Sequence, residues 1–67
     1  MPKKRFGFIA VEKGLITLDQ LIEAMKIQVR EDLEKTKHRL IGEILVDMGF
    51  MNPSQVDEVL NDMKRQK

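Results

Sequence analysis

Residues 6–15 read FGFIAVEKGL, and residues 41–50 read IGEILVDMGF. The two stretches lie 35 positions apart, and in both of them the second and ninth residues are glycine. Three consecutive aliphatic residues stand between the glycines, Ile9-Ala10-Val11 in the first stretch and Ile44-Leu45-Val46 in the second. Self-similarity at a fixed period indicates a duplicated structural unit. Extended outward, the match predicts two copies, roughly 4–31 and 39–66, that form a single domain over residues 1–67.

Each copy is predicted to contain two helices separated by a glycine. Phe6, Ile9 and Ala10 recur at helical spacing in the first copy, and their counterparts do so in the second. Gly14 and Gly49 then stand where these short helices would end, because glycine tolerates the positive φ that usually follows a helix. A bulky apolar residue comes after each glycine and can fold back on the last turn, as in a Schellman motif.

The start of the second helix in each copy is also marked. Thr17 can cap a helix N-terminus, and Gln20, three residues later, completes a capping box. Asn52 and Gln55 have the same spacing, and Pro53 occupies the first helical position, where its missing N–H costs nothing. We therefore interpret Thr17 and Asn52 as helix caps.

The connection between the copies carries no helix-breaking residue. Neither Gly nor Pro occurs between Leu15 and Ile41, so we expect the second helix to run to about Thr36. A short turn near Lys37-His38 would then fold the second copy back. If this turn straightened, two chains could exchange copies, so a homodimer is one hypothesis.

The predicted fold is all-α, with four helices built from two tandem helical hairpins, the second helix being the longest. No segment alternates with period two, so no sheet is expected. The expected core consists of Phe6, Ile9, Ala10, Leu15, Leu18, Leu21, Ile22, Met25, Val29, Ile41, Ile44, Leu45, Met48, Phe50, Val56, Val59 and Leu60.

Composition narrows the classes of function. The 67 residues include no cysteine, and 12 basic residues against 11 acidic ones give a net charge of +1. We therefore expect no nucleic-acid binding through bulk charge. No apolar run is long enough to span a bilayer, and no secretory signal is present, so a cytoplasmic protein without membrane insertion is expected. His38 lies in a charged stretch without metal-ligand partners, and we expect no metal, no cofactor and no enzymatic activity.

Both copies resemble a known repeat motif, RLGxxLVxxGxxxxxxLxxxLxxQ. This motif belongs to the N-terminal domain of the bacterial ATPases that assemble type II secretion systems and type IV pili. The matching residues of the first copy are Arg5-Phe6-Gly7, Ala10-Val11, Gly14, Leu21, Met25 and Gln28, and those of the second are Ile41-Gly42, Leu45-Val46, Gly49, Val56 and Leu60. In the second copy, Leu40 replaces the motif Arg and Met63 replaces the motif Gln.

The resemblance implies two alternative functions. Such domains link the ATPase to a membrane assembly platform, which implies a protein-interaction module. In the MshEN-type version, two tandem copies bind cyclic di-GMP, which implies a receptor. On that alternative Arg5 would contact guanine or phosphate, Gly7 would allow close approach and Gln28 would bond a base edge, with Phe6 and Gly42 beside them. Two chains could each supply one complete motif across a dimer axis, and a purely structural role is a third alternative.

Overall fold

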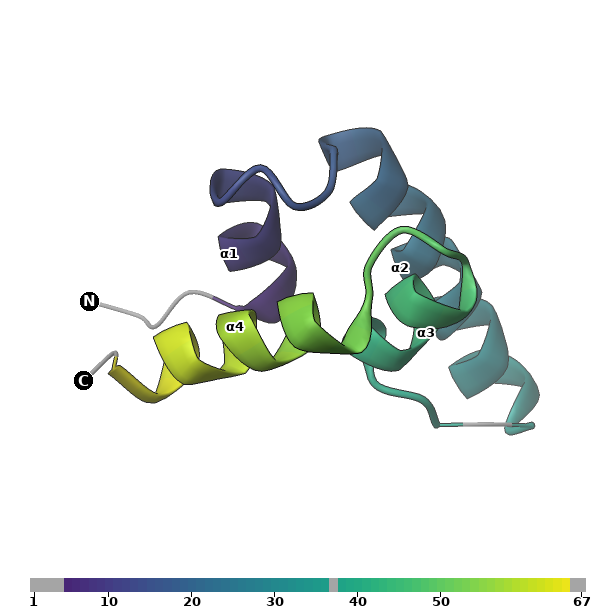
Figure 1. Cartoon of the computed structure of the whole chain (residues 1–67). Helices are drawn as coiled ribbons and strands as arrows, with labels where there is room; N and C mark the ends of the chain where they lie inside the picture. Colours follow the sequence, from purple (N-terminus) through teal and green to yellow (C-terminus); the bar gives the residue numbers. More distant parts are fainter. Residues whose placement is uncertain (1–4, 37, 66–67) are drawn as a thin grey trace.

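The computed structural model describes residues 5–36 and 38–65, and these contain four helices and no strand (Figure 1). The helices are α1 (Phe6–Glu12), α2 (Leu18–Glu34), α3 (Ile41–Asp47) and α4 (Pro53–Arg65). The predicted all-α fold with a long second helix is confirmed. Lys4, Lys37 and Gln66, which stand at the predicted copy limits and in the predicted turn, lie outside the described residues.

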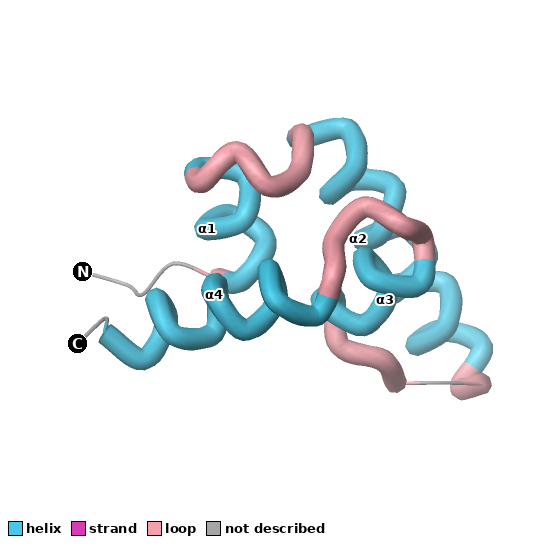
Figure 2. The backbone as a smooth tube through the Cα atoms, in the orientation of Figure 1, coloured by secondary structure: helices cyan, strands magenta, loops and turns pink. Residues whose placement is uncertain are grey.

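Both short helices end in a Schellman motif, as the glycines predicted. Gly14 has φ 76° and Gly49 has φ 81°. The N–H of Leu15 donates to the carbonyl of Ala10 at 3.0 Å, and the matching bond from Phe50 has the same length. These bonds satisfy carbonyls that a helix end leaves without partners, and they reverse the chain into the loop before the next helix (Figure 2).

Both long helices begin with the predicted capping box. Thr17 Oγ1 accepts from the N–H of Gln20 at 3.1 Å, and Gln20 Oε1 accepts from the N–H of Thr17 at 2.9 Å. Asn52 Oδ1 and Gln55 Oε1 make the same reciprocal pair at 2.9 and 3.0 Å. Polar side chains thus satisfy orphan N–H groups at both helix starts, which fixes where α2 and α4 begin.

The end of α2 corrects the prediction. The helix stops at Glu34, two residues before the expected end, because Lys35 takes the left-handed conformation with φ 57°. The N–H groups of Lys35 and Thr36 donate to the carbonyls of Asp32 and Glu31, both at 3.3 Å. The same hydrogen-bond pattern ends α1 and α3, where glycine occupies the left-handed position. In α2 a lysine occupies it, and its Cβ atom makes the left-handed conformation sterically unfavourable. Because residue 35 is neither glycine nor proline, the sequence does not indicate that α2 ends there.

The two copies interlock instead of forming separate hairpins. In Figure 1, α1 stands across α4 and contacts it, and α3 lies against α2. If the two copies are exchanged, α1 takes the place of α3, and α2 takes the place of α4. The α1–α4 contact then becomes the α3–α2 contact, and the α1–α3 contact stays the same. This is the pattern of an approximate twofold relation within one chain. Each short helix therefore packs on the long helix of the other copy.

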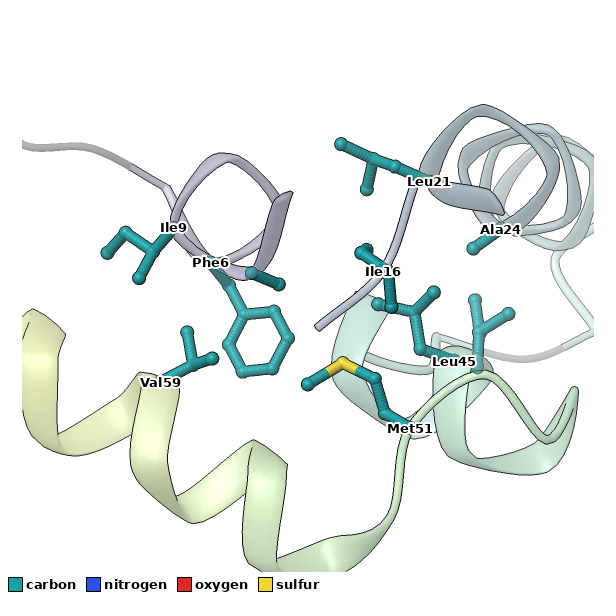
Figure 3. Packing of buried hydrophobic residues seen from close by; sticks show 10 residues of the cluster. Phe6, Ile9, Ile16, Leu21, Ala24, Leu45, Met51 and Val59 are labelled. Carbon is teal, nitrogen blue, oxygen red and sulfur yellow. The ribbon is translucent and has the colours of Figure 1, made fainter. Parts of the chain in front are cut away.

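The core lies where the four helices and the two glycine-containing loops converge (Figure 3). Phe6 points from α1 toward Val59 of α4, and Ala24 of α2 points toward Leu45 of α3. Ile44, Leu45 and Val59 are fully buried. Of the expected core residues, those that are buried are Phe6, Ile9, Ala10, Leu21, Ile44, Leu45 and Val59. Leu15, Ile41, Met48, Phe50 and Val56 are partly buried against this cluster.

Five of the expected core residues are exposed, so that part of the prediction was wrong. They are Leu18, Ile22, Met25, Val29 and Leu60. In α2 the buried side is formed instead by Leu21 and Ala24, because the absence of a large side chain at position 24 lets α3 approach closely. Ile16 and Met51, which occupy equivalent loop positions, are also buried although the helical pattern did not select them.

Candidate functional site

A groove between the two copies is built from equivalent positions. Seven residues of the first copy line it, and in every case the residue 35 positions later lines it as well. The pairs are Arg5 with Leu40, Phe6 with Ile41, Gly7 with Gly42, Phe8 with Glu43, Leu21 with Val56, Met25 with Leu60, and Gln28 with Met63. We call this hollow the central groove; its volume is about 430 Å³. That volume lies within the range of small-ligand sites, about 300–1,000 Å³.

The central groove brings the candidate ligand residues together. Arg5, Phe6, Gly7, Gln28 and Gly42 all line it, although the sequence spreads them over 38 positions. The capping residues, which are Gly14, Thr17, Gly49 and Asn52, do not line it and act at the helix ends described above. The structure therefore separates the candidate ligand residues from the residues that cap the helices.

The two groove glycines are sites of close helix packing. A Cβ atom at Gly7 would lie 2.6 Å from Leu21 Cδ1, and one at Gly42 would lie 3.1 Å from Phe6 Cζ. Both glycines are buried. Their lack of a side chain lets Leu21 and Phe6 fill the floor of the groove, which gives these glycines a packing role without any ligand.

The two copies contribute side chains of different polarity to the groove. Arg5 stands at the first residue before α1, whereas the equivalent position before α3 holds Leu40, which is 70% exposed. Gln28 likewise has Met63 as its counterpart. The first copy thus contributes a cation and an amide that are able to hold an anion or a base edge, and the second copy contributes two apolar side chains at the equivalent positions.

The polar groups of the groove are partly engaged with the protein itself. Gln28 Nε2 donates to the carbonyl of Arg39 at 3.2 Å, which ties α2 to the segment before α3. Glu43 Oε1 accepts from the N–H of Leu40 at 3.1 Å and so helps to cap α3. The side chain of Gln28 is therefore held by its own chain and would have to share this bond with a ligand.

Large apolar side chains surround the polar groups of the groove. Phe8, Met25, Leu40 and Leu60 are between 43% and 70% exposed. Within the described lining, Arg5 and Glu43 are the charged residues, and no nucleophile stands beside a general base. This lining suits apolar contact with a partner or ligand better than acid–base chemistry.

An ion-pair cluster holds the end of α1 against α4. Lys13 Nζ lies 2.8 Å from Asp62 Oδ2 and 3.0 Å from Glu58 Oε2. The hydrogen bond from Lys13 keeps the pKa of Asp62 below its ordinary value, and the same bond raises the pKa of Lys13. These contacts fasten one copy to the other beyond the apolar core.

A second cluster fixes the segment between α2 and α3. Arg39 Nη2 lies 2.6 Å from Glu31 Oε2, and its Nε donates to Glu31 Oε1 at 3.1 Å. Arg39 Nη1 also pairs with Asp47. The Glu31 carboxylate raises the pKa of Arg39 further above its ordinary value. A two-pronged guanidinium–carboxylate contact is rigid, so it supports the left-handed turn at Lys35 that precedes it.

Metal ligation has no support among the described side chains, where no group of three His, Cys, Asp or Glu residues is suitably placed. His38 is exposed, with Nδ1 3.4 Å from Asp32 Oδ1. None of the helices in residues 5–36 and 38–65 has the length and apolar character that crossing a membrane requires.

Sequence reasoning missed several groove residues that the repeat itself could have supplied. Phe8, Leu40, Glu43 and Met63 were not selected, because Leu40 and Met63 depart from the motif and Phe8 and Glu43 fall on its unspecified positions. Applying the 35-residue shift to Arg5 and Gln28 points directly to Leu40 and Met63. The repeat therefore contained the information needed to find these residues, provided that equivalent positions of the two copies line the same groove.

No protein-family model, curated protein or solved structure matches this chain. The likeness to the secretion and pilus ATPase domain therefore rests on the motif residues of the two copies.

Proposed function

We propose that the domain is a non-enzymatic protein-interaction module that holds an amphipathic helix of a partner in the central groove. The observation that carries this proposal is the apolar contribution of the second copy to the groove, where Leu40 and Met63 occupy the positions equivalent to Arg5 and Gln28. Because the second copy has two apolar side chains where the first has a cation and an amide, the groove favours contact with apolar side chains of a partner. The partner is a component of an assembly machine, if the resemblance to the ATPase domains extends to their role.

Docking of a helix would cover the rim of the groove. Amphipathic helices place anchors at positions i, i+3, i+4 and i+7 into apolar grooves. Phe8, Leu40 and Leu60 offer exposed hydrocarbon for such anchors, and burial yields about 25 cal/mol per Å². Arg5 at one end favours an acidic residue at the corresponding end of the partner helix, which would set its direction.

The test begins with a photo-reactive phenylalanine analogue in place of Phe8, used in the source cell to trap and identify the partner. The trapped segment is then synthesised, and its affinity for the pure domain is measured by fluorescence anisotropy. We expect Leu40→Glu and Leu60→Glu to weaken binding at least tenfold, about 1.4 kcal/mol. Leu33→Glu is the matched control, because Leu33 is 77% exposed but lies outside the groove.

Equal affinities for the wild type, Leu40→Glu and Leu60→Glu would contradict the proposed site. An acidic-to-basic change in the partner segment tests its direction, because it should weaken binding to the wild type and be partly rescued by Arg5→Glu. If Arg5→Glu gives no rescue, the assigned direction is wrong even if the groove is correct.

The second candidate is a receptor for cyclic di-GMP. It is favoured by the convergence of Arg5, Gly7, Gln28 and Gly42 on one groove of ligand size. A guanidinium can stack on a purine and donate to phosphate. Titration calorimetry with cyclic di-GMP should then show binding that Arg5→Ala abolishes.

A gain-of-function variant sharpens this test. Leu40→Arg combined with Met63→Gln gives both copies the same polar pair, which suits a ligand that is itself twofold symmetric. Tighter binding by this double variant than by the wild type would support a nucleotide groove. Absence of binding to both proteins at millimolar nucleotide would reject the receptor and leave the protein-interaction proposal in place.

A further inference from the structure

Helix α2 carries a second apolar face that the fold leaves uncovered. Leu18, Ile22, Met25, Val29 and Leu33 are each at least 40% exposed, and they are spaced by four, three, four and four residues. At 100° per residue, this spacing keeps all five on one side of the helix, over a length of about 22 Å. We call this row the α2 stripe. Single exposed apolar residues are common, but a continuous row of this kind marks an interaction surface.

The α2 stripe is distinct from the side of α2 that enters the core. Leu21 and Ala24 are buried and Ile27 is half-buried. Only Met25 lines both the central groove and the hollow along the stripe. The stripe therefore offers a surface largely separate from the proposed partner site.

Charged residues beside the α2 stripe change sign along the helix. Asp19 and Glu23 lie in the N-terminal half, and Lys26 and Arg30 lie in the C-terminal half, all four on the same flank and exposed. In a parallel twofold pair, the charged flanks of the two helices would lie on opposite sides of the interface and would not meet. Two antiparallel copies would set the acidic half of each helix against the basic half of the other, which is a self-complementary arrangement.

We propose that a second copy of this chain covers the α2 stripe, with the two α2 helices antiparallel about a twofold axis near Met25. Full overlap of the two stripes places Leu18 opposite the partner's Leu33, and the helix dipoles then also oppose. This dimer leaves the loop between the copies intact, so it differs from an exchange of copies between chains.

The size of the α2 stripe sets the expected strength. A strip about 22 Å long and about 10 Å wide is well below the ~800 Å² per partner of a stable interface. The dimer should therefore be reversible, with half-association in the range of about 10 μM to 1 mM.

Sedimentation velocity over that concentration range tests the surface. We expect the wild type to shift from monomer to dimer, and Val29→Glu and Leu33→Glu to weaken association at least tenfold. Leu40→Glu is the matched control, since Leu40 is similarly exposed but lies outside the stripe. Circular dichroism checks that each variant keeps its helices. A wild type that stays monomeric at 1 mM, or a dimer that survives both stripe variants, would overturn the proposal.

Charge-reversal variants test the antiparallel orientation. Lys26→Glu with Arg30→Glu makes the flank acidic throughout, and Asp19→Lys with Glu23→Lys makes it basic throughout. In an antiparallel dimer each double variant repels itself, and mixing the two restores association. In a parallel dimer the double variants would associate no more weakly than the wild type, which would refute the orientation.

Disulfide trapping gives an independent measure, because the chain has no cysteine of its own. With antiparallel helices, Leu18→Cys and Leu33→Cys should form an oxidised dimer when mixed, and neither should do so alone. Cross-linking of each variant with itself, and none between them, would show parallel helices.

Discussion

The backbone at Gly14 provides a quantitative test of how each copy turns. Gly14 has φ 76°, and a Cβ atom built on it would have nothing within 4 Å. Gly14→Ala therefore adds no steric clash with neighbouring residues and changes only the local backbone energy. The change in the free energy of unfolding therefore measures the cost of the left-handed conformation without a contribution from packing.

The expected cost of Gly14→Ala is about 1 kcal/mol. The left-handed region costs an L-residue about 1–2 kcal/mol, and the reduced freedom of the unfolded chain returns about 0.4–1 kcal/mol. A chain of 67 residues has a total stability of roughly 3–10 kcal/mol. For a domain of this size, the loss should lower the melting midpoint by about 4–8 °C.

Thermal and urea unfolding, followed by circular dichroism at 222 nm, measure this change. Gly14→Asn is the control, because asparagine enters the left-handed region more readily than alanine and should lose less. The equivalent Gly49→Ala should cost a similar amount, since Gly49 has φ 81° and also has open space around it. A midpoint for Gly14→Ala equal to that of the wild type would refute the assignment of the turn.

Three further predictions concern stability. Lys35→Gly should stabilise the protein by about 1 kcal/mol in urea unfolding, because it relieves the left-handed lysine that ends α2; a loss of stability would show that the lysine side chain contributes more than its strain. Asp62 has a lowered pKa, so its charged form stabilises the fold at pH values above its ordinary pKa of 3.8, and this contribution is lost as the pH falls through the lowered pKa. Asp62→Asn should therefore make the stability depend less steeply on pH on the acid side. An unchanged slope would contradict the pairing with Lys13. Ala24→Leu should lower the free energy of unfolding by about 1–3 kcal/mol through overpacking, whereas Val29→Leu on the exposed stripe should change it by no more than about 0.5 kcal/mol. Equal effects of the two substitutions would contradict the assignment of the buried and exposed faces of α2.

The sequence determined the local structure almost completely. The 35-residue repeat, the glycines at 14 and 49 and the caps at Thr17 and Asn52 predicted four helices, because caps and left-handed turns depend on the residues beside them. The one failure of this kind is Lys35, where tertiary contacts of Arg39 and Gln28 support a turn that no glycine announces.

The candidate site was partly predictable. The motif supplied Arg5, Phe6, Gly7, Gln28 and Gly42, and the fold brings all of them into one groove. The sequence could not show that Gln28 donates to the Arg39 carbonyl, because that bond depends on where α2 ends.

Only the tertiary structure decided which apolar side of α2 is buried. The helix offers one row that contains Leu21 and Ala24 and another that runs from Leu18 to Leu33, and both follow helical periodicity. Hydrophobic spacing identifies a face that favours burial but does not identify its partner. Close approach of α3 selects the row with the small residue at position 24, and the row with the larger side chains stays on the surface, where a second molecule can reach it.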